Sequence, residues 1–437
     1  IITADVISGT GNITLDAGND LDVNAAVTSG GSGTIYLTSV SNTTIDSQLT
    51  SATGDILVEA GLTLTQDAAI TSTIGDVGLI AGSTLAQTSN GDITTGGDVL
   101  VSAGADWTMA GDTVITATGN VVGEALSGDI GLGVINGVNV ALSASNSILD
   151  SNAGSLNVSA TSLSLVATSG LIGGSDTGNG NADANDNAID ITVSTLAASS
   201  DAGIYLSETD GLTVTTVAAV TVDIESVVRV NFNSTTIDVS ENQTRSSLED
   251  LSTTTDGPIK IVSLAGSLTI NGGSGGPGVS ADGSGDVLLE AAQDVITNAD
   301  VVSGTGNITL DAGNDLDVNA ALTSGGSGTI YLTSVSNTTI DSQLTSATGD
   351  ILVESGVDIT QTAAITSTSG DIGLIAGSTL AQTTNGDITT GGDVLASAGT
   401  DWTMAGDAVI TATGNVVGEA LSGDIGLGVI NGVNVAL

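Results

Sequence analysis

The chain has 437 residues, 40% of them apolar, and it carries 49 acidic against three basic side chains, for a formal net charge of −46. The apolar share excludes an intrinsically disordered chain, and the charge excludes nucleic acid as a partner and direct insertion into an anionic membrane. Because the sequence has neither cysteine nor histidine, it offers no disulfide, thiolate metal site or Ser-His-Asp triad, and we do not expect an enzyme.

An internal repeat dominates the sequence. Residues 1–142 return at 296–437 with a constant offset of 295 residues and no gap. The stretch Ser8–Ala26 recurs unchanged as Ser303–Ala321, and the few differences elsewhere include mild exchanges such as Ile7/Val302 and Val77/Ile372. Because the chain starts and stops within this pattern, we expect a fragment of a longer tandem array, with export signals and anchors outside it.

A shorter period lies within residues 1–142. A glycine, typically followed by Asn or Asp, recurs every 21 or 22 residues at Gly11, Gly33, Gly54, Gly75, Gly97 and Gly119. Two positions later stand Ile13, Ile35, Ile56, Val77, Val99 and Val121, and four positions later stand Leu15, Leu37, Val58, Leu79 and Val101, then Gly123. This alternation predicts a β-strand with one buried face in each period.

Each period holds two further apolar positions. Ten residues after the glycine stand Leu21, Leu64, Leu85 and Trp107, and sixteen residues after it stand Val27, Leu49 and Ile70. Three inward-facing segments separated by polar turns predict an all-β fold, an elongated parallel β-helix with coils of about 21–22 residues. Such coils stack at roughly 4.8 Å and together bury one continuous core.

The repeat divides the chain into four parts. Residues 1–142 form regular coils, and residues 143–256 keep a less regular β-helical pattern with an Asx-rich loop. Residues 257–295 resume the coils and include a Gly-rich linker, and residues 296–437 copy the first part. The segment Val222–Asp256 carries two of the three basic residues, and we predict that it makes a capping, lateral or inter-repeat contact.

The coils resemble a known family. The motif Gly-[Asp/Asn]-[Ile/Val]-x-[Leu/Val], the Ala-rich second halves and the polar turns of residues 1–142 and 257–437 are similar to the haemagglutinin-type repeats of filamentous haemagglutinin-like exoproteins. These are large secreted bacterial adhesins. The resemblance implies a right-handed parallel β-helix and a role as a surface stalk or giant adhesin.

The few aromatic residues give little support to a sugar-binding enzyme. β-Helix polysaccharide lyases and glycosidases bind sugar on aromatic platforms and use basic groups, of which this chain has three. Trp107 and Trp402 fall in the register of Leu21, so we expect them to fill the core. Tyr36 and Tyr331 fall on outward positions, where an exposed aromatic is ordinary, and we assign them no binding role.

One loop is a candidate cation site. Asn179, Asn181, Asp183, Asn185 and Asn187 alternate with small residues, so in an extended backbone their oxygens would lie on one side, as coordination of a hard cation requires. The loop lacks the glycine and the bidentate glutamate of an EF-hand. Two interpretations stay open, a bound Ca²⁺ ion and a simple solvated turn, and the turn is favoured. No cofactor is otherwise required.

Aspartates recur at the coil turns. Asp55, Asp76 and Asp98 occupy the same place in successive coils, and their copies 295 residues later do the same. Their carboxylates should stack about 5 Å apart, and like charges at that distance repel each other. We expect these side chains to rotate outward into water, with shared cations as the alternative.

Together these features predict a structural role. The chain would be a stalk or fibre segment of a very large secreted or surface-attached bacterial adhesin-like repeat protein, or alternatively a self-assembling extracellular filament or sheath subunit. An ice-binding face ranks below both because Thr-x-Thr, found at Thr63–Thr65 and Thr213–Thr215, does not recur coil after coil. A polysaccharide-active β-helix ranks equally low. The expected partners are other copies of the chain or neighbouring repeats, and a host or surface receptor.

Overall fold

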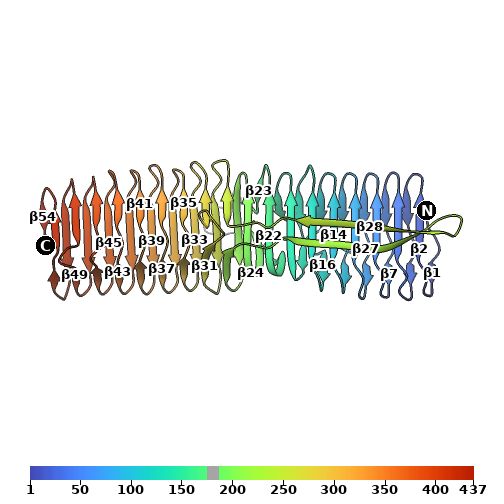
Figure 1. The fold of residues 1–437 in the computed structure, drawn as a ribbon, viewed down its shortest axis with the longest axis horizontal. Coiled ribbons are helices and arrows are strands. Elements are labelled where there is room, and N and C mark those ends of the chain that lie inside the picture. The colour runs from blue at the N-terminus through green and yellow to red at the C-terminus, as the bar shows by residue number, and fades with distance from the viewer. Residues whose placement is uncertain (175–186) are drawn as a thin grey trace. The chain divides into compact units, whose positions relative to one another are not determined.

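The computed structural model describes residues 1–174 and 187–437. They form two compact units, the first comprising Ile1–Ser194 with Val217–Leu248 and the second comprising Thr195–Thr216 with Glu249–Leu437. Every regular element among the described residues is a β-strand, and parallel strands stack as a β-solenoid of about 19 turns. The predicted fold class is therefore confirmed. Within each unit the strands follow one another coil by coil (Figure 1).

No helix among the described residues is long and apolar enough to cross a membrane.

A regular coil contributes three strands to three parallel ladders. The coil that begins at Gly33 contains β5 (Ile35–Ser39), β6 (Thr43–Ile45) and β7 (Leu49–Ser51). Each strand pairs in parallel with the strand at the same place in the next coil, so that Ile35 of β5 lies opposite Ile56 of β8. The predicted register is confirmed, because the alternating apolar positions of successive coils lie side by side along the core.

The first unit contains the following strands. The ladder of long strands is made of β2 (Ile13–Ala17), β5, β8 (Ile56–Ala60), β11 (Val77–Ala81), β14 (Val99–Ala103), β17 (Val121–Ala125), β20 (Asn139–Ala144) and β22 (Val158–Ala167). The second ladder is made of β3 (Leu21–Val23), β6, β9 (Leu64–Gln66), β12 (Leu85–Gln87), β15 (Trp107–Met109), β18 (Ile130–Leu132), β21 (Ile148–Asp150) and β23 (Leu171–Ile172). The third is made of β1 (Val6–Ser8), β4 (Val27–Ser29), β7, β10 (Ile70–Ser72), β13 (Ile93–Thr95), β16 (Val114–Ala117) and β19 (Val134–Asn136).

The second unit repeats the three ladders. Its long strands are β25 (Gly203–Glu208), β30 (Ile259–Ser263), β33 (Val287–Ala291), β36 (Ile308–Ala312), β39 (Ile330–Ser334), β42 (Ile351–Ser355), β45 (Ile372–Ala376), β48 (Val394–Ala398), β51 (Val416–Ala420) and β54 (Val435–Ala436). The next ladder holds β26 (Leu212–Thr215), β31 (Leu268–Gly272), β34 (Val295–Thr297), β37 (Leu316–Val318), β40 (Thr338–Ile340), β43 (Ile359–Gln361), β46 (Leu380–Gln382), β49 (Trp402–Met404) and β52 (Ile425–Gly426). The last holds β29 (Leu251–Thr253), β32 (Val279–Ala281), β35 (Val301–Ser303), β38 (Leu322–Ser324), β41 (Leu344–Ser346), β44 (Ile365–Ser367), β47 (Ile388–Thr390), β50 (Val409–Ala412) and β53 (Val429–Asn431), together with the end of β24 (Ile189–Ser200).

The two tryptophans lie in the core, as predicted. Trp107 and Trp402 are fully buried, and each indole Nε1 donates a hydrogen bond of 2.9 Å to a buried glutamine oxygen, that of Gln87 or of Gln382. A Cβ atom on Gly123 would collide with the Trp107 ring. The glycine that interrupts the apolar pattern of its coil therefore makes room for the indole.

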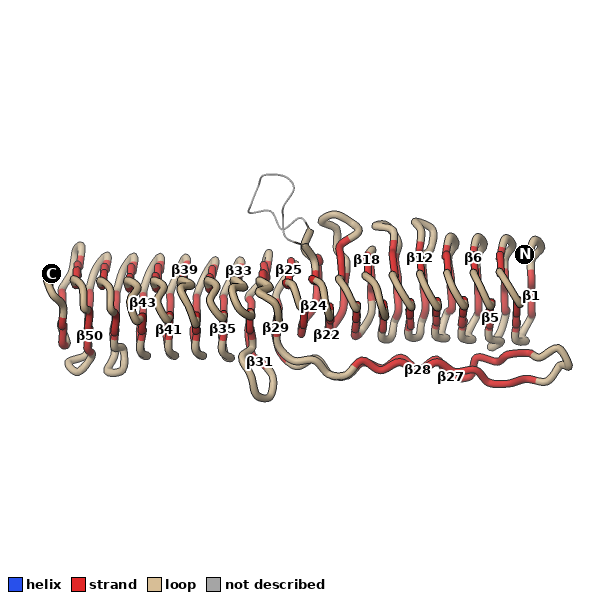
Figure 2. Tube along the Cα trace, turned by 90° about the horizontal axis from the view of Figure 1, so that it is seen from above, coloured by secondary structure: helices blue, strands red, loops and turns tan. Residues whose placement is uncertain are grey.

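One element of the first unit lies outside the solenoid. The strands β27 (Val220–Val230) and β28 (Thr236–Arg245) form an antiparallel hairpin, and an isolated bridge between Val217 and Leu248 closes its base. In Figure 2 this hairpin extends along one side of the coils of its own unit. We call Val217–Leu248 the hairpin.

Candidate functional site

The candidate site is an apolar stripe on the outside of the long-strand ladder. The strand register aligns the outward side chains that stand three positions after the coil glycines, and it places Ala141 opposite the last of them, Val122. In the first unit this outer stripe consists of Thr14, Tyr36, Leu57, Gly78, Leu100, Val122 and Ala141. Because the residues on either side of Leu57 and Leu100 point into the core, these strands are apolar on both faces.

The hairpin covers the outer stripe of the first unit. Its apolar side chains, those of Val220, Val222, Ile224 and Val227, pack into one cluster with Tyr36, Leu57, Leu100, Val122 and Ala141. The stripe has a notch at Gly78, where an added Cβ would lie 2.5 Å from Cδ1 of Ile224. Glycine at this position therefore lets the Ile224 side chain approach the coil backbone.

Polar contacts fix the course of β27 across the coils. The backbone N–H of Val230 donates to Oγ1 of Thr14 at 2.8 Å, and that of Val228 donates to Oγ1 of Thr34 at 2.8 Å. Near the other end of the strand, Nδ2 of Asn120 donates to the carbonyl oxygen of Thr221 at 3.2 Å. The strand thus runs back from a late coil of the first unit to its earliest coils, in contact with β20, β17, β14, β8, β5 and β2.

Two arginines of the hairpin pair with acids of the coils. Arg229 Nη2 lies 2.5 Å from Oδ2 of Asp16, and both side chains are partly exposed. Arg245 pairs with Glu124, a buried carboxylate that also accepts hydrogen bonds of 2.7 Å from Gln243 Nε2 and Ser102 Oγ. Burial lowers the pKa of Arg245. The hairpin therefore neutralises a carboxylate that it also removes from water.

The expectation that Tyr36 is exposed is wrong. The hairpin leaves this side chain 5% exposed, and its hydroxyl donates to Oε2 of Glu59 at 2.5 Å. Burial and this hydrogen bond to a carboxylate raise the pKa of Tyr36 to about 12. Tyr331, the copy in the second unit, is only partly buried although its hydroxyl donates to Glu354 Oε2 in the same way, at 2.6 Å.

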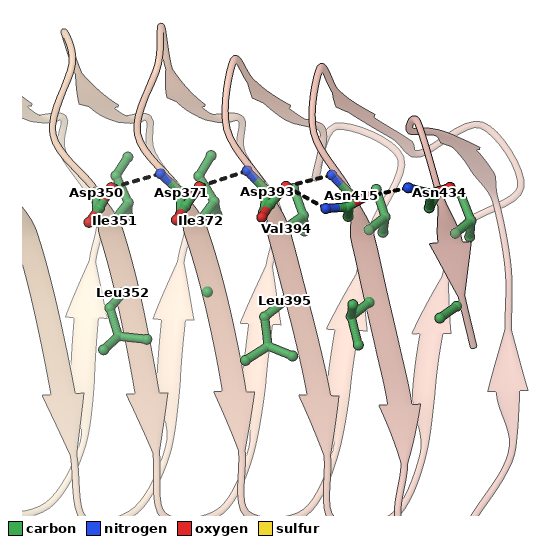
Figure 3. A pocket seen from close by; sticks show the side chains of 15 residues that line it. Asp350, Ile351, Leu352, Asp371, Ile372, Asp393, Val394, Leu395, Asn415 and Asn434 are labelled. Carbon is green, nitrogen blue, oxygen red and sulfur yellow. Dashed lines mark hydrogen bonds between the residues drawn. The ribbon is translucent and has the colours of Figure 1, made fainter.

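The aspartates at the coil turns follow the expectation only in part, because Asp350, Asp371 and Asp393 are exposed whereas Asp55, Asp76 and Asp98 are half-buried. They do not simply rotate into water, because Asp55 Oδ1 accepts the backbone N–H of Asp76 at 2.8 Å and Asp76 Oδ1 accepts that of Asp98 at 2.7 Å. Asp371 and Asp350 of the second unit make the same contact at 2.7 Å (Figure 3). A turn N–H that points along the stack needs an acceptor, and the side chain of the preceding coil supplies it.

Burial under the hairpin makes the charged form of Asp76 less favourable. Burial raises the pKa of Asp76 to about 6, although the hydrogen bond from Asp98 opposes the shift, and the charges of Asp55, Asp98 and Asp223 add to it. Asp223 belongs to the hairpin. The hairpin therefore brings a further like charge to the column as it buries the outer stripe.

The predicted cation loop lies almost wholly outside the described residues. Asn179, Asn181, Asp183 and Asn185 belong to the part of the chain that the structure does not describe, and Asn187 is exposed. In residues 1–174 and 187–437, no group of three or more His, Cys, Asp or Glu side chains is placed to hold a metal ion.

Among the described residues, nothing covers the same outer stripe in the second unit. The groove there has a volume of about 640 Å³ and includes Leu352, Gly373, Leu395 and Val417 in its lining (Figure 3). Leu395 is 38% and Val417 45% exposed, whereas their first-unit copies, Leu100 and Val122, are 3% and 0% exposed. The chain therefore contains one stripe that is covered and one that is open.

Sequence reasoning missed both stripes, although a signal was present. The runs Ile56–Val58 and Val99–Val101 are apolar at every position. Such runs are typical of strands buried on both faces, and they distinguish these strands from the half-buried strands of the other two ladders.

No protein-family model matches this sequence, and neither a curated protein nor a solved structure matches it. The family resemblance therefore depends on the coil motif.

Proposed function

We propose that this chain is a structural shaft segment of a very large secreted or surface-attached bacterial adhesin-like repeat protein. The observation that carries the proposal is the continuity of the parallel ladders within each unit, where every regular coil pairs with the next along all three strands. A stack of this kind needs no ligand to hold its form, because each coil buries the apolar face of its neighbour.

Close backbone contacts support the same role. A Cβ atom on Gly61 would collide with the carbonyl oxygen of Val40 in the preceding coil, and one on Gly356 would collide with that of Val335. Glycine at these turns thus permits tight stacking of coils, and the aspartate contacts described above tie the turns together along the stack. The net charge of −46 keeps such a protein soluble and repels unspecific contacts between copies.

A force measurement tests the shaft. The full chain, held by its two ends in an optical trap, should resist extension and then lengthen in steps that correspond to whole coils. A coil of 21 or 22 residues releases about 7 nm of extended chain. A smooth extension at low force, without steps, would contradict a load-bearing role.

The alternative, a self-assembling filament or sheath, has one observation in its favour. The open groove of the second unit exposes apolar side chains that its copy in the first unit buries. The hairpin, which we expected to make a capping, lateral or inter-repeat contact, packs on its own unit. Sedimentation velocity over a hundredfold concentration range separates the two functions, because open-ended growth favours the filament and a constant monomer favours the shaft.

A further inference from the structure

We propose that the open outer stripe of the second unit is a docking site for a second β-hairpin of the Val217–Leu248 type, supplied by another copy of this 295-residue repeat. This second outer stripe consists of Thr309, Tyr331, Leu352, Gly373, Leu395, Val417 and Ala436. The inference goes beyond the proposed shaft, which requires no such contact.

The two outer stripes carry identical contact residues. The coil residues that hold the hairpin in the first unit all recur unchanged 295 positions later. The pairs are Thr14/Thr309, Asp16/Asp311, Thr34/Thr329, Tyr36/Tyr331, Leu57/Leu352, Gly78/Gly373, Leu100/Leu395, Asn120/Asn415, Val122/Val417, Glu124/Glu419 and Ala141/Ala436. A surface with the same residues in the same strand register offers the same contacts to the same ligand.

The two outer stripes also share a notch at a glycine. In the first unit, Ile224 occupies the notch at Gly78, between the flanking side chains of Leu57 and Leu100. At Gly373 an added Cβ would meet one side-chain atom within 4 Å, Cδ1 of Leu352 at 2.9 Å, and nothing from outside the coils. The notch that receives an isoleucine in one unit is thus open in the other.

The polar groups beside the two outer stripes are arranged alike. Glu419 accepts a hydrogen bond of 2.9 Å from Ser397 Oγ through its Oε1, as Glu124 does from Ser102. In the first unit, Oε2 of that carboxylate accepts from Gln243 and Arg245 of the hairpin. The corresponding oxygen of Glu419 is therefore placed to receive the same two donors.

Charge and backbone geometry favour a β-ribbon over other occupants. The rim of the groove carries Asp350, Asp371 and Asp393, which repel anionic lipid and nucleic acid. In the first unit, Thr14 and Thr34 accept alternate backbone N–H groups of an extended strand. Their copies, Thr309 and Thr329, therefore suit a strand and not a helix. The two arginines of the hairpin pair with Asp16 and Glu124 of the first unit, and both acids recur in the second unit as Asp311 and Glu419.

A peptide titration tests the proposal. The probe is a synthetic Val217–Leu248 peptide with a fluorophore, titrated with the full chain and followed by anisotropy. The tethered hairpin keeps the first outer stripe covered, because its effective concentration exceeds that of the free peptide. We expect saturable binding with one peptide per chain.

Matched variants locate the binding site. Gly373→Leu fills the notch and should weaken peptide binding at least tenfold, whereas Thr345→Leu, an outward substitution on another ladder of the same unit, should leave it unchanged. Glu419→Gln changes an exposed side chain and should keep the fold. It should weaken peptide binding severalfold because glutamine cannot form an ion pair with Arg245 of the peptide. A peptide carrying Ile224→Asp should not bind.

Three results would overturn the docking site. The first is that the peptide shows no saturable binding to the chain. The second is that the peptide binds the wild-type chain and the Gly373→Leu and Glu419→Gln variants with equal affinity. The third is that the Ile224→Asp peptide binds the chain as tightly as the wild-type peptide does. Circular dichroism melting of each variant shows whether its fold is intact, and Glu419→Gln keeps the test decisive if Gly373→Leu unfolds. Any of these results would leave the force-bearing shaft untouched.

Discussion

Residues 1–142 and 296–437 are nearly the same sequence with two different surfaces. Their core positions correspond one to one, with exchanges such as Val77/Ile372 and Val101/Ala396, yet the outer stripe is buried under a hairpin in the first unit and open in the second. The pattern of a coil therefore decides what points inward, whereas the burial of an outward residue is decided by what packs on it. This makes the chain its own control, because a substitution can be placed at a covered position and at its uncovered copy.

The two buried tryptophans allow each unit to be followed separately. Trp107 belongs to the first unit and Trp402 to the second. In a Trp402→Phe background the fluorescence of Trp107 reports unfolding of the first unit, and in a Trp107→Phe background Trp402 reports the second. The first two predictions below use these paired backgrounds.

The largest effect should be the same in both units. Ile56→Asp and Ile351→Asp each place a carboxylate in the core, where the isoleucine is almost fully buried and an acid finds no partner. We expect each to cost roughly 4 kcal/mol or more in the free energy of unfolding, measured by denaturant titration with the matching tryptophan. A clear difference between the two would show that the hairpin also stabilises the core.

The next effect should differ between the units. Leu57→Asp places a charge under the hairpin and should cost about 2–4 kcal/mol, whereas Leu352→Asp at the open copy should cost less than about 1 kcal/mol. The outward position of Leu57 in the alternating pattern would by itself suggest a mild effect, but the hairpin leaves Leu57 fully buried. Equal losses at the two positions would mean that the hairpin is not docked in solution.

The two arginines of the hairpin should contribute unequally. Arg245→Ala leaves the buried carboxylate of Glu124 without its cation and should cost about 2–3 kcal/mol. Arg229→Ala breaks a partly exposed pair and should cost less than about 1 kcal/mol. Denaturant titration of the Trp402→Phe background measures both, and Glu124→Gln in the Arg245→Ala variant should recover part of the loss. Similar costs for the two arginines would count against a special role for burial at Glu124.

The smallest effect concerns pH. The pKa of Asp76 is about 6 in the folded chain against 3.8 for the free side chain, so between these values the folded state binds more protons than the unfolded state. Stability contributed through Asp76 is therefore present below the unfolded pKa and is lost as pH rises through the folded one. Asn can accept the same backbone hydrogen bond, as Asn12 Oδ1 does from Thr34 at 2.9 Å.

Asp76→Asn should consequently raise the melting temperature at pH 7 by about 2 °C, after discounting for partial solvent exposure, and should change nothing near pH 4. Asp371→Asn, its copy in the second unit, provides the control without a covering hairpin. Thermal melts at pH 4 and pH 7 measure both variants. A rise of the same size at both pH values would assign the effect to something other than titration.

The sequence predicted the core well and the outer stripe poorly, for physical reasons. Ile56 and Val58 lie in the core as expected, because a two-residue alternation repeated in every coil leaves one consistent register. The contact between the hairpin and the outer stripe was not predicted, because Val230 and Thr14 are 216 positions apart and no local sequence pattern links them. The aspartate column was located correctly, but its hydrogen bonds follow from unpaired turn N–H groups, which a sequence does not display.

The long reach of the hairpin sets an order of events during folding. The first coils of the first unit are complete once their own neighbours have formed, yet the segment that covers Tyr36 and Leu57 begins only at Val217. In a chain that emerges from its amino terminus, the outer stripe of these coils must stay exposed to water until that segment arrives. During this interval the nascent coils present an apolar surface to any other chain nearby, and docking of the hairpin ends that exposure.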